Sequence, residues 1–419
     1  MLDIKFIREN PEKIKAAAKA KNLPINLERI LELDKLSNQL QKEFEDLRHQ
    51  QKQIKTKPAK KELAQLKKLA KKLKQQEEKH KKITQELEQL LLLVPNIPSP
   101  EAPIGKDETA NQVIKIWGNP IRFNFEPKSH TELAKSLDII DFERGVKIGG
   151  FRSYFLKNEG VLLDLAIHRY ALDFMLARGF NLMIPPVIAE EKYFYGTGFM
   201  PWFKEEIYRI SEAKKKLALI GTSEIPLISY HAGEILFESE LPKRYAGFSP
   251  CFRTEIGSYG KDTKGLYRLH QFNKVEQVVF CRNNLQESQR WLEEIQKNAE
   301  DFIESLGLPY RVMEMCTGEM GAAKIRQFDL ETWMPSYNHY RETHSASNLG
   351  DFQARRLGIR YRDKKGKIQY VHTLNNTLIA TPRILIPLLE NCQHKDGSVT
   401  IPKVLQKYTG FANINPKKK

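Results

Sequence analysis

The chain has 419 residues, 41% of them hydrophobic, and a formal net charge of +16, which allows two domains, one of them with a large core. No run of about 18 apolar residues occurs and the first residues show no signal-peptide pattern, so membrane-spanning and secreted classes are excluded and we expect a cytoplasmic protein. The four cysteines are far apart and form no Cys-x-x-Cys pair, so we expect buried thiols and no zinc.

The positive charge is concentrated near the N-terminus. The stretch from Lys35 to Gln85 contains 16 basic and 6 acidic residues. Within it, apolar residues recur every third or fourth position from Ile30 to Ile54 and again from Leu63 to Leu90, and Pro58 interrupts the pattern. After a short helical segment within residues 1–23, this predicts an antiparallel two-helix coiled-coil arm over about residues 27–92.

Two interpretations of this arm are open. A heptad repeat is typical of a dimerisation coiled coil or of a solvated, lysine-rich surface helix. Basic charge gathered on one element instead suggests an arm that binds RNA through phosphates and shape. The charge balance favours the RNA-binding arm.

The second half of the chain has a different pattern. Residues 94–105 contain four prolines and no helical period, which predicts a linker between an N-terminal domain, residues 1–105, and a second domain, residues 106–419. From Gln112 onward strand-like runs and helices alternate irregularly, and no Gly-x-Gly-x-x-Gly follows a strand. We therefore expect an α+β domain built on a mostly antiparallel β-sheet flanked by helices.

A long hairpin dominates this domain, with predicted strands at residues 245–256 and 266–281 around a glycine-rich loop. Alternation distributes seven charged or aromatic side chains over the strand faces: Arg253, Glu255, Arg268, His270, Phe272, Lys274 and Glu276. They could simply form surface ion pairs. However, arginines suit phosphates and carboxylates, a phenylalanine can stack on a base, and a carboxylate can bind an amino group, which favours a site for a nucleotide and an amino acid.

The loop of this hairpin is not a P-loop. Gly260 and Gly265 bracket four residues, but Leu266 and Tyr267 follow where such a loop requires lysine and serine or threonine.

Phe-Arg-Thr-Glu, the glycine-rich loop and Arg-Leu-His-Gln-Phe-Asn-Lys-Val-Glu together resemble motif 2 of class II aminoacyl-tRNA synthetases, specifically of the seryl-tRNA synthetases. The predicted helix at residues 161–178 and the proline-ended stretch after it resemble motif 1, which implies a homodimer. Residues 373–390 resemble motif 3, with Pro382, which we place at a helix start, where many relatives have glycine. The basic hairpin is similar to the arm with which this family holds tRNA(Ser).

The resemblance implies a pocket for L-serine, lined by Thr222, Glu224, Arg253, Glu276 and Thr377. The stretch Thr222-Ser223-Glu224 also fits a helix cap, and both interpretations can hold together.

The resemblance also implies an ATP site with Arg253, Arg268 and Arg383 as the catalytic groups. The residues implied to bind ATP are Arg253, Thr254, Glu255, Arg268, Phe272, Glu342, Thr343, His344, Ser345 and Arg383. Glu342 and Ser345, at positions i and i+3, are implied as Mg²⁺ ligands because hard Mg²⁺ prefers oxygen donors.

The function implied is serine activation by ATP and transfer of serine to tRNA(Ser), and the resemblance leaves tRNA(Sec) open as a second acceptor. One alternative is a seryl-adenylate ligase for a carrier protein, which would not require a basic arm. Another is a catalytically silent paralogue that binds RNA, which should show gaps in motif 2 or motif 3. The sequence shows no such gap.

Overall fold

The structure of the chain is a computed structural model that describes residues 2–53, 60–211, 214–256 and 265–417. The chain divides into two compact units, Met1–Ile97 and Pro98–Lys419. Within the described residues, no helix combines the length and the apolar character needed to cross a membrane.

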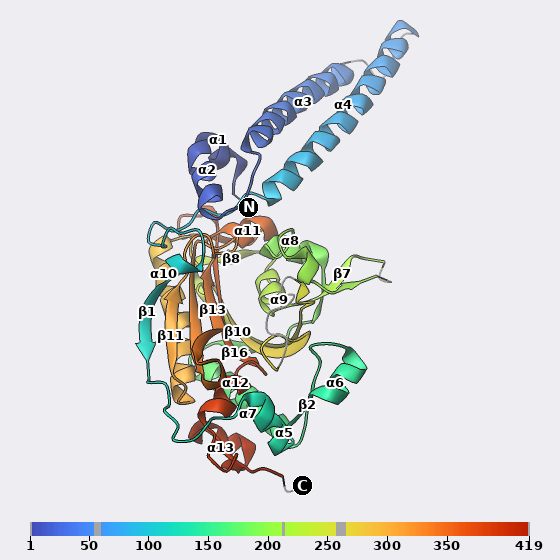
Figure 1. Cartoon of the computed structure of the whole chain (residues 1–419). Helices are drawn as coiled ribbons and strands as arrows, with labels where there is room; N and C mark the ends of the chain where they lie inside the picture. The colour runs from blue at the N-terminus through green and yellow to red at the C-terminus, as the bar shows by residue number, and fades with distance from the viewer. Residues whose placement is uncertain (1, 54–59, 212–213, 257–264, 418–419) are drawn as a thin grey trace. The chain divides into compact units, whose positions relative to one another are not determined.

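The first unit contains a long helical hairpin, as predicted. Its helices are α1 (Ile4–Glu9), α2 (Pro11–Ala20), α3 (Leu27–Gln53) and α4 (Lys60–Leu92). Helices α3 and α4 run antiparallel (Figure 1): Arg29 pairs with Glu86, Ser37 lies 3.2 Å from His80, and Gln76 donates to Glu43. The predicted break at Pro58 lies outside the described residues.

The base of the hairpin has its own hydrophobic core. This core contains Ile7, Ile14, Leu27, Ile30, Leu33, Leu87, Leu91 and Val94. The segment predicted as one helical pattern forms two helices, because Asn10 ends α1 and Pro11 begins α2. An ion pair of 2.8 Å between Arg8 and Asp34 links α1 to α3.

The second unit is built on an eight-stranded sheet in the order β1-β11-β12-β13-β16-β10-β9-β4. Every neighbouring pair is antiparallel except β4 and β9. The strands are β1 (Gln112–Trp117), β4 (Asn181–Met183), β9 (Lys243–Phe252), β10 (Gln271–Cys281), β11 (Tyr310–Glu314), β12 (Arg326–Met334), β13 (His339–Asn348) and β16 (His372–Thr381).

Two long helices, α7 (Glu159–Ala177) and α10 (Leu285–Ser305), cover one face of this sheet. They also contact each other, since the Tyr170 hydroxyl donates to Ser305 over 2.9 Å. Because strand side chains alternate between faces, Val275 and Val279 of β10 enter this core while Glu276 points to the opposite face. Lys274 and Glu276 of β10 therefore lie on the face opposite these two helices.

Shorter elements surround this sheet. The helices are α5 (His130–Leu137), α6 (Phe142–Gly149), α8 (Glu191–Thr197), α9 (Glu224–Ser229), α11 (Phe352–Leu357), α12 (Leu385–Asn391) and α13 (Lys403–Thr409). The strands of the small sheets are β2 (Ile140–Asp141), β3 (Phe155–Leu156), β5 (Ile188–Glu190), β6 (Arg209–Ile210), β7 (Leu217–Leu219), β8 (Ile235–Phe237), β14 (Arg360–Arg362), β15 (Ile368–Tyr370), β17 (Val399–Thr400) and β18 (Asn413–Ile414).

The predicted hairpin strands were too long at their inner ends. Strand β9 ends at Phe252 and β10 begins at Gln271, so Arg253, Glu255 and Arg268 lie outside the sheet. The ladder stops because the backbone of other segments forms hydrogen bonds with these residues. Thr254 N donates to the carbonyl oxygen of Glu206, and His270 N donates to the carbonyl oxygen of Arg152. Most of the predicted loop, residues 257–264, lies outside the described residues.

Candidate active site

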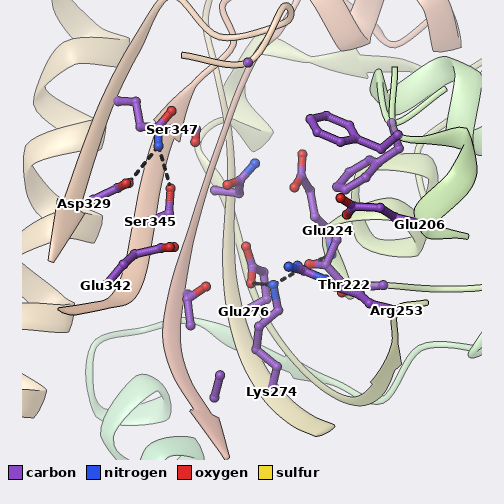
Figure 2. A pocket seen from close by; sticks show the side chains of 18 of the residues that line it. Glu206, Thr222, Glu224, Arg253, Lys274, Glu276, Asp329, Glu342, Ser345 and Ser347 are labelled. Atoms are coloured by element: carbon purple, nitrogen blue, oxygen red, sulfur yellow. Dashed lines mark hydrogen bonds and ion pairs between the residues drawn. The ribbon is translucent and has the colours of Figure 1, made fainter. Parts of the chain in front are cut away.

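A cavity of about 580 Å³ opens on the face of the sheet opposite α7 and α10. Its floor consists of side chains from β10, β12, β13 and β16, and the segment before α9 closes one side. Figure 2 shows two groups of polar residues on opposite sides of the cavity: Thr222, Glu224 and Arg253 on one, Asp329, Glu342 and Ser345 on the other, with Glu276 and Lys274 between them.

A buried lysine organises the first group. Lys274 Nζ donates to Thr222 Oγ1 over 2.6 Å and forms an ion pair with Glu276. All three residues are buried, so the ammonium charge offsets a carboxylate that water does not reach. Glu276 also stands opposite Thr377 in the ladder between β10 and β16, which brings the Thr377 hydroxyl group to the same cavity.

Glu224 lies at the first position of α9 in the same group. Its amide donates to Thr222 Oγ1 over 3.2 Å, but the N-cap residue is Ser223 and its side chain makes no capping hydrogen bond, so the helix-cap interpretation is not confirmed. Burial and the charge of Glu276 raise the pKa of Glu224 to about 7, although Gln353 donates to its carboxylate over 2.8 Å. Glu224 therefore changes charge near neutral pH.

Arg253 borders this group and contacts the floor. Its Nε donates to Gly221 O over 3.2 Å, and its guanidinium lies 5.4 Å from the centre of the Phe272 ring. Arg253, Phe272 and Glu255 all line the cavity. The cavity thus places a cation, an aromatic face and a carboxylate on one wall, the groups predicted for an adenine nucleotide.

Glu342 and Ser345 share a face through a β-bulge. In a regular strand, residues three apart point to opposite faces. In β13, however, Leu330 of β12 pairs with His344 and the next residue, Glu331, pairs with Glu342, so Thr343 is an extra residue. The bulge turns Glu342 toward the cavity beside Ser345.

The second group is acidic and consists of oxygen donors. Burial and the negative charge of Glu342 raise the pKa of Asp329 to about 7, while Gln327 donates to both Asp329 and Ser345. Among the described residues, no cluster of three or more His, Cys, Asp or Glu side chains is arranged to hold a metal ion. One or two carboxylates and a hydroxyl group fit Mg²⁺, which completes its octahedron with water and phosphate oxygens.

Arg383 lies at the same end of the cavity as Glu342. Its Nε donates to Tyr267 O over 3.1 Å, and its Nη1 lies 4.0 Å from a carboxylate oxygen of Glu342. Pro382 also lines the cavity, but it does not begin a helix as predicted. It sits in a turn, because Leu385 N donates to Pro382 O and α12 begins at Leu385.

Three predicted ATP-binding residues do not line the cavity. Thr254 donates its hydroxyl to Glu205 O over 2.6 Å, and Arg268 lies 3.2 Å from the Glu255 carboxylate, which it holds from outside. The His344 ring is buried on the helix-covered side, where burial lowers its pKa to about 3 and Nε2 donates to Leu378 O over 2.9 Å. His344 points away because it alternates with Ser345 along β13.

Sequence reasoning assigned no role to several residues of the site. Lys274 precedes Glu276 by two positions, so the alternation that placed Glu276 in the site also placed Lys274 there. It received no role because, in sequence alone, a lysine two positions from a glutamate looks like an exposed ion pair. Asp329 could have been found by its pairing with Ser345, had the register been known. Gln353 lies in Asp351-Phe-Gln-Ala-Arg-Arg356, a stretch that resembles the family, but the resemblance gave this glutamine no role. Glu206 carries no local signal, since long-range folding brings it to the site.

Comparisons with known proteins agree with this geometry. The family model "tRNA synthetase class II core domain (G, H, P, S and T)" matches residues 203–392, and the model "Seryl-tRNA synthetase N-terminal domain" matches residues 1–98. The chain is 47% identical to the serine–tRNA ligase of Dictyoglomus thermophilum over 100% of both chains, and 43% identical to that of Deinococcus radiodurans over 99% of both.

Solved structures give the same result. The seryl-tRNA synthetase from Pyrococcus horikoshii, in a crystal structure complexed with ATP, has a TM-score of 0.90 and 41% identity over 100% of both chains. The cytoplasmic serine–tRNA ligase from Naegleria fowleri, in complex with AMP, has a TM-score of 0.87 and 33% identity, covering 100% of this chain and 99% of that one.

The mostly antiparallel sheet, the cavity on one of its faces and these matches define the chain as a class II aminoacyl-tRNA synthetase. Within that class, the chain belongs to the seryl-tRNA synthetase family, the serine–tRNA ligases. The predicted fold class and family are confirmed.

Proposed function

We propose that this cavity joins L-serine to ATP and then delivers serine to tRNA(Ser). In the first step the serine carboxylate attacks the α-phosphorus of ATP, the bond to the bridging oxygen breaks, and pyrophosphate leaves. In the second step a hydroxyl group of the terminal tRNA ribose attacks the carbonyl carbon of seryl-adenylate, and AMP leaves. No protein nucleophile is required, because the attacking carboxylate is already ionised.

The acidic recess around Lys274 is the observation that carries this proposal. Serine presents an ammonium group, and Glu224 and Glu276 supply negative charge close to Thr222. The Thr377 hydroxyl lies on the same floor and suits the serine side chain. A close pocket rejects threonine by the bulk of its methyl group, and buried polar groups left without a partner reject alanine.

Arg253 lies between this recess and the space for ATP. We assign it to the serine carboxylate and the α-phosphate, Phe272 to the adenine ring, and Glu255 to the adenine amino group. Arg268 then acts indirectly by holding Glu255. Because charge develops on phosphate oxygens, fixed cations in a preorganised site stabilise the transition state.

Glu342 and Ser345 would hold Mg²⁺, which would supply positive charge to the phosphates of ATP. Asp329 lies in the same cavity, and its pKa of about 7 reflects its burial and, after that, the charge of Glu342 nearby. Arg383 approaches from motif 3, and we place it at the γ-phosphate. Removal of Mg²⁺ with EDTA should abolish adenylate formation.

We assign tRNA binding to the hairpin of α3 and α4, whose exposed lysines suit phosphates. The tRNA for selenocysteine is a possible second substrate. Since tRNA is the acceptor, we place the reaction in the cytoplasm.

A homodimer is also part of the proposal. The motif 1 region exposes several large apolar side chains, namely Leu162, Leu165, Leu176, Leu182 and Ile184. If they form the dimer interface, Leu165→Glu should yield a monomer in light scattering.

The decisive test is ATP–pyrophosphate exchange by the purified protein with serine, threonine, alanine or glycine, with and without Mg²⁺. We expect exchange with serine and Mg²⁺ alone. Equal exchange with threonine would contradict the assigned pocket, and no exchange with any of the four would contradict the proposed reaction.

A further inference from the structure

Tyr267 contacts two other parts of the site, strand β13 and the motif 3 arginine, Arg383. It lines the cavity and is 6% exposed. Its hydroxyl donates to Glu342 O over 3.0 Å. Its own carbonyl accepts from Arg383 Nε over 3.1 Å, and the Arg383 guanidinium lies 4.4 Å from the ring centre. One side chain thus contacts both β13 and the arginine of motif 3.

The contacts converge on one acceptor. Arg383 Nη1 donates to Glu342 O over 3.4 Å, so this carbonyl accepts from Arg383 and from the Tyr267 hydroxyl. A carbonyl oxygen has two lone pairs and can accept both. The Arg341 guanidinium lies 3.9 Å from the centre of the Tyr267 ring and that of Arg268 lies 6.0 Å from it, so three cations, with Arg383, share this aromatic ring.

The backbone before Tyr267 is anchored by a buried histidine. Leu266 N donates to His130 Nε2 over 3.3 Å, and His130 Nδ1 lies 2.7 Å from Glu390 Oε1. Since Nε2 accepts, the ring proton of this tautomer is on Nδ1 and is donated to Glu390. Gly265 has φ +82° and passes so close that a Cβ there would lie 2.1 Å from His130 Nε2.

We propose that Tyr267 is a positioning residue that joins Arg383 and the strand segment of Glu342 into one rigid unit. Through its carbonyl and ring it holds Arg383, and through its hydroxyl it holds the bulged segment of β13. The phosphate-binding cation and the Mg²⁺ ligand therefore keep a fixed separation. This inference rests on the proposed function, which assigns phosphate and Mg²⁺ to these two residues.

Two variants separate the contacts. Tyr267→Phe removes only the hydroxyl bond to Glu342 O. We expect the Mg²⁺ concentration for half-maximal ATP binding, followed by calorimetry without serine, to rise about threefold to tenfold. Tyr267→Met also removes the ring beneath Arg383, and we expect a further weakening of ATP binding by about tenfold. KM for serine should stay within about twofold in both variants.

The matched control is Tyr170→Phe, which removes a comparable hydroxyl bond, to Ser305, away from the cavity. It should keep the parent's Mg²⁺ dependence. Parental Mg²⁺ and ATP dependence in Tyr267→Phe would overturn the proposal. A rise in KM for serine as large as the change in Mg²⁺ and ATP dependence, together with a fall in Tm, would also overturn it. Such a result would indicate a purely structural role for Tyr267.

The two proposals can fail separately. If the parent protein binds ATP with Mg²⁺ but shows no serine-dependent exchange, the proposed reaction fails, and the calorimetric comparison still decides the role of Tyr267. If the parent does not bind ATP at all, both are wrong. Should Tyr267→Met not fold, Tyr267→Phe alone decides, because it retains the ring and its packing.

Discussion

Lys274 Nζ lies 2.6 Å from Thr222 Oγ1, although 52 residues separate the two in the chain. The same ammonium group forms the ion pair with Glu276 on its own strand. One lysine thus joins the segment before α9 to β10 and places a positive charge among buried carboxylates. Because a buried charge is costly without a partner, this lysine controls both the stability of the recess and its charge.

Lys274→Met should therefore be strongly destabilising. We expect a loss of about 3 kcal/mol in the free energy of unfolding, because Glu276 loses its counterion in a buried site. Urea denaturation measures this. The control is Lys243→Met, which breaks a more exposed ion pair of 2.9 Å with Glu240 and should cost about 0 to 1 kcal/mol. Equal losses in the two variants would mean that Lys274 is not needed to offset the buried charge.

The pKa of Glu224 predicts that serine binds more tightly at higher pH. Burial and the charge of Glu276 raise this pKa from 4.5 to about 7, and the serine ammonium group should bind the ionised carboxylate. KM for serine should then fall as pH rises from 6 to 8, by up to about tenfold per pH unit below the pKa. Glu224→Gln should raise KM and remove this dependence. If Glu224→Gln retained the full pH dependence of KM for serine, the titrating group would be a residue other than Glu224.

The same group makes stability depend on pH in a defined direction. The folded chain keeps the Glu224 proton up to about pH 7, whereas the unfolded chain releases it near 4.5. Its contribution to stability is therefore fully present below pH 4.5 and is lost as pH rises through 7. The difference in unfolding free energy between the parent and Glu224→Gln, measured across this window, should shift by a few kcal/mol in favour of the variant.

Arg253→Ala should abolish most adenylate formation without unfolding the protein. Arg253 is the cation between the serine recess and the Phe272 ring, and removing one such group costs roughly 100-fold to 1000-fold in rate. Serine-dependent pyrophosphate exchange measures the loss. Arg282→Ala, which breaks a surface ion pair with Glu287, is the control and should retain full exchange. Near-normal exchange in Arg253→Ala would remove this residue from the mechanism.

The basic arm should affect tRNA and not serine activation. Lys67, Lys71 and Lys74 are exposed and lie on one face of α4. Changing all three to Gln should raise KM for tRNA and reduce its salt dependence, because each phosphate contact contributes a slope of about 0.9 in log affinity against log salt. Pyrophosphate exchange should be unchanged. An unaltered tRNA KM would contradict the assigned role of this face.

The sequence predicted the elements that local pattern controls. The heptad pattern predicted the positions of α3 and α4 to within a few residues. The irregular alternation of strand-like runs and helices, with no Gly-x-Gly-x-x-Gly after a strand, predicted a mostly antiparallel sheet. The ends of β9 and β10 were missed because partners distant in the chain, Glu206 and Arg152, take backbone groups that alternation alone would assign to the ladder.

Within the site, period-two alternation placed Glu276 and Phe272 in the cavity. It could not place Glu342 and Ser345 together, since positions i and i+3 of a regular strand face apart and the bulge at Thr343 is set by tertiary pairing. His344 does not line the cavity, because it alternates with Ser345 along the regular part of β13. Arg268 was assigned to ATP through the resemblance to motif 2, which does not tell whether the arginine touches the ligand or supports Glu255, the residue that it contacts in the structure.

The bulge at Thr343 also means that this site depends on the pairing register of β13 as well as on its chemistry. If the ladder became regular with Thr343 opposite Glu331, the chain would keep every polar group of the cavity, yet Glu342 would turn to the face covered by α7 and α10. Such a loss changes no residue, so a comparison that scores only residue identity would overlook it.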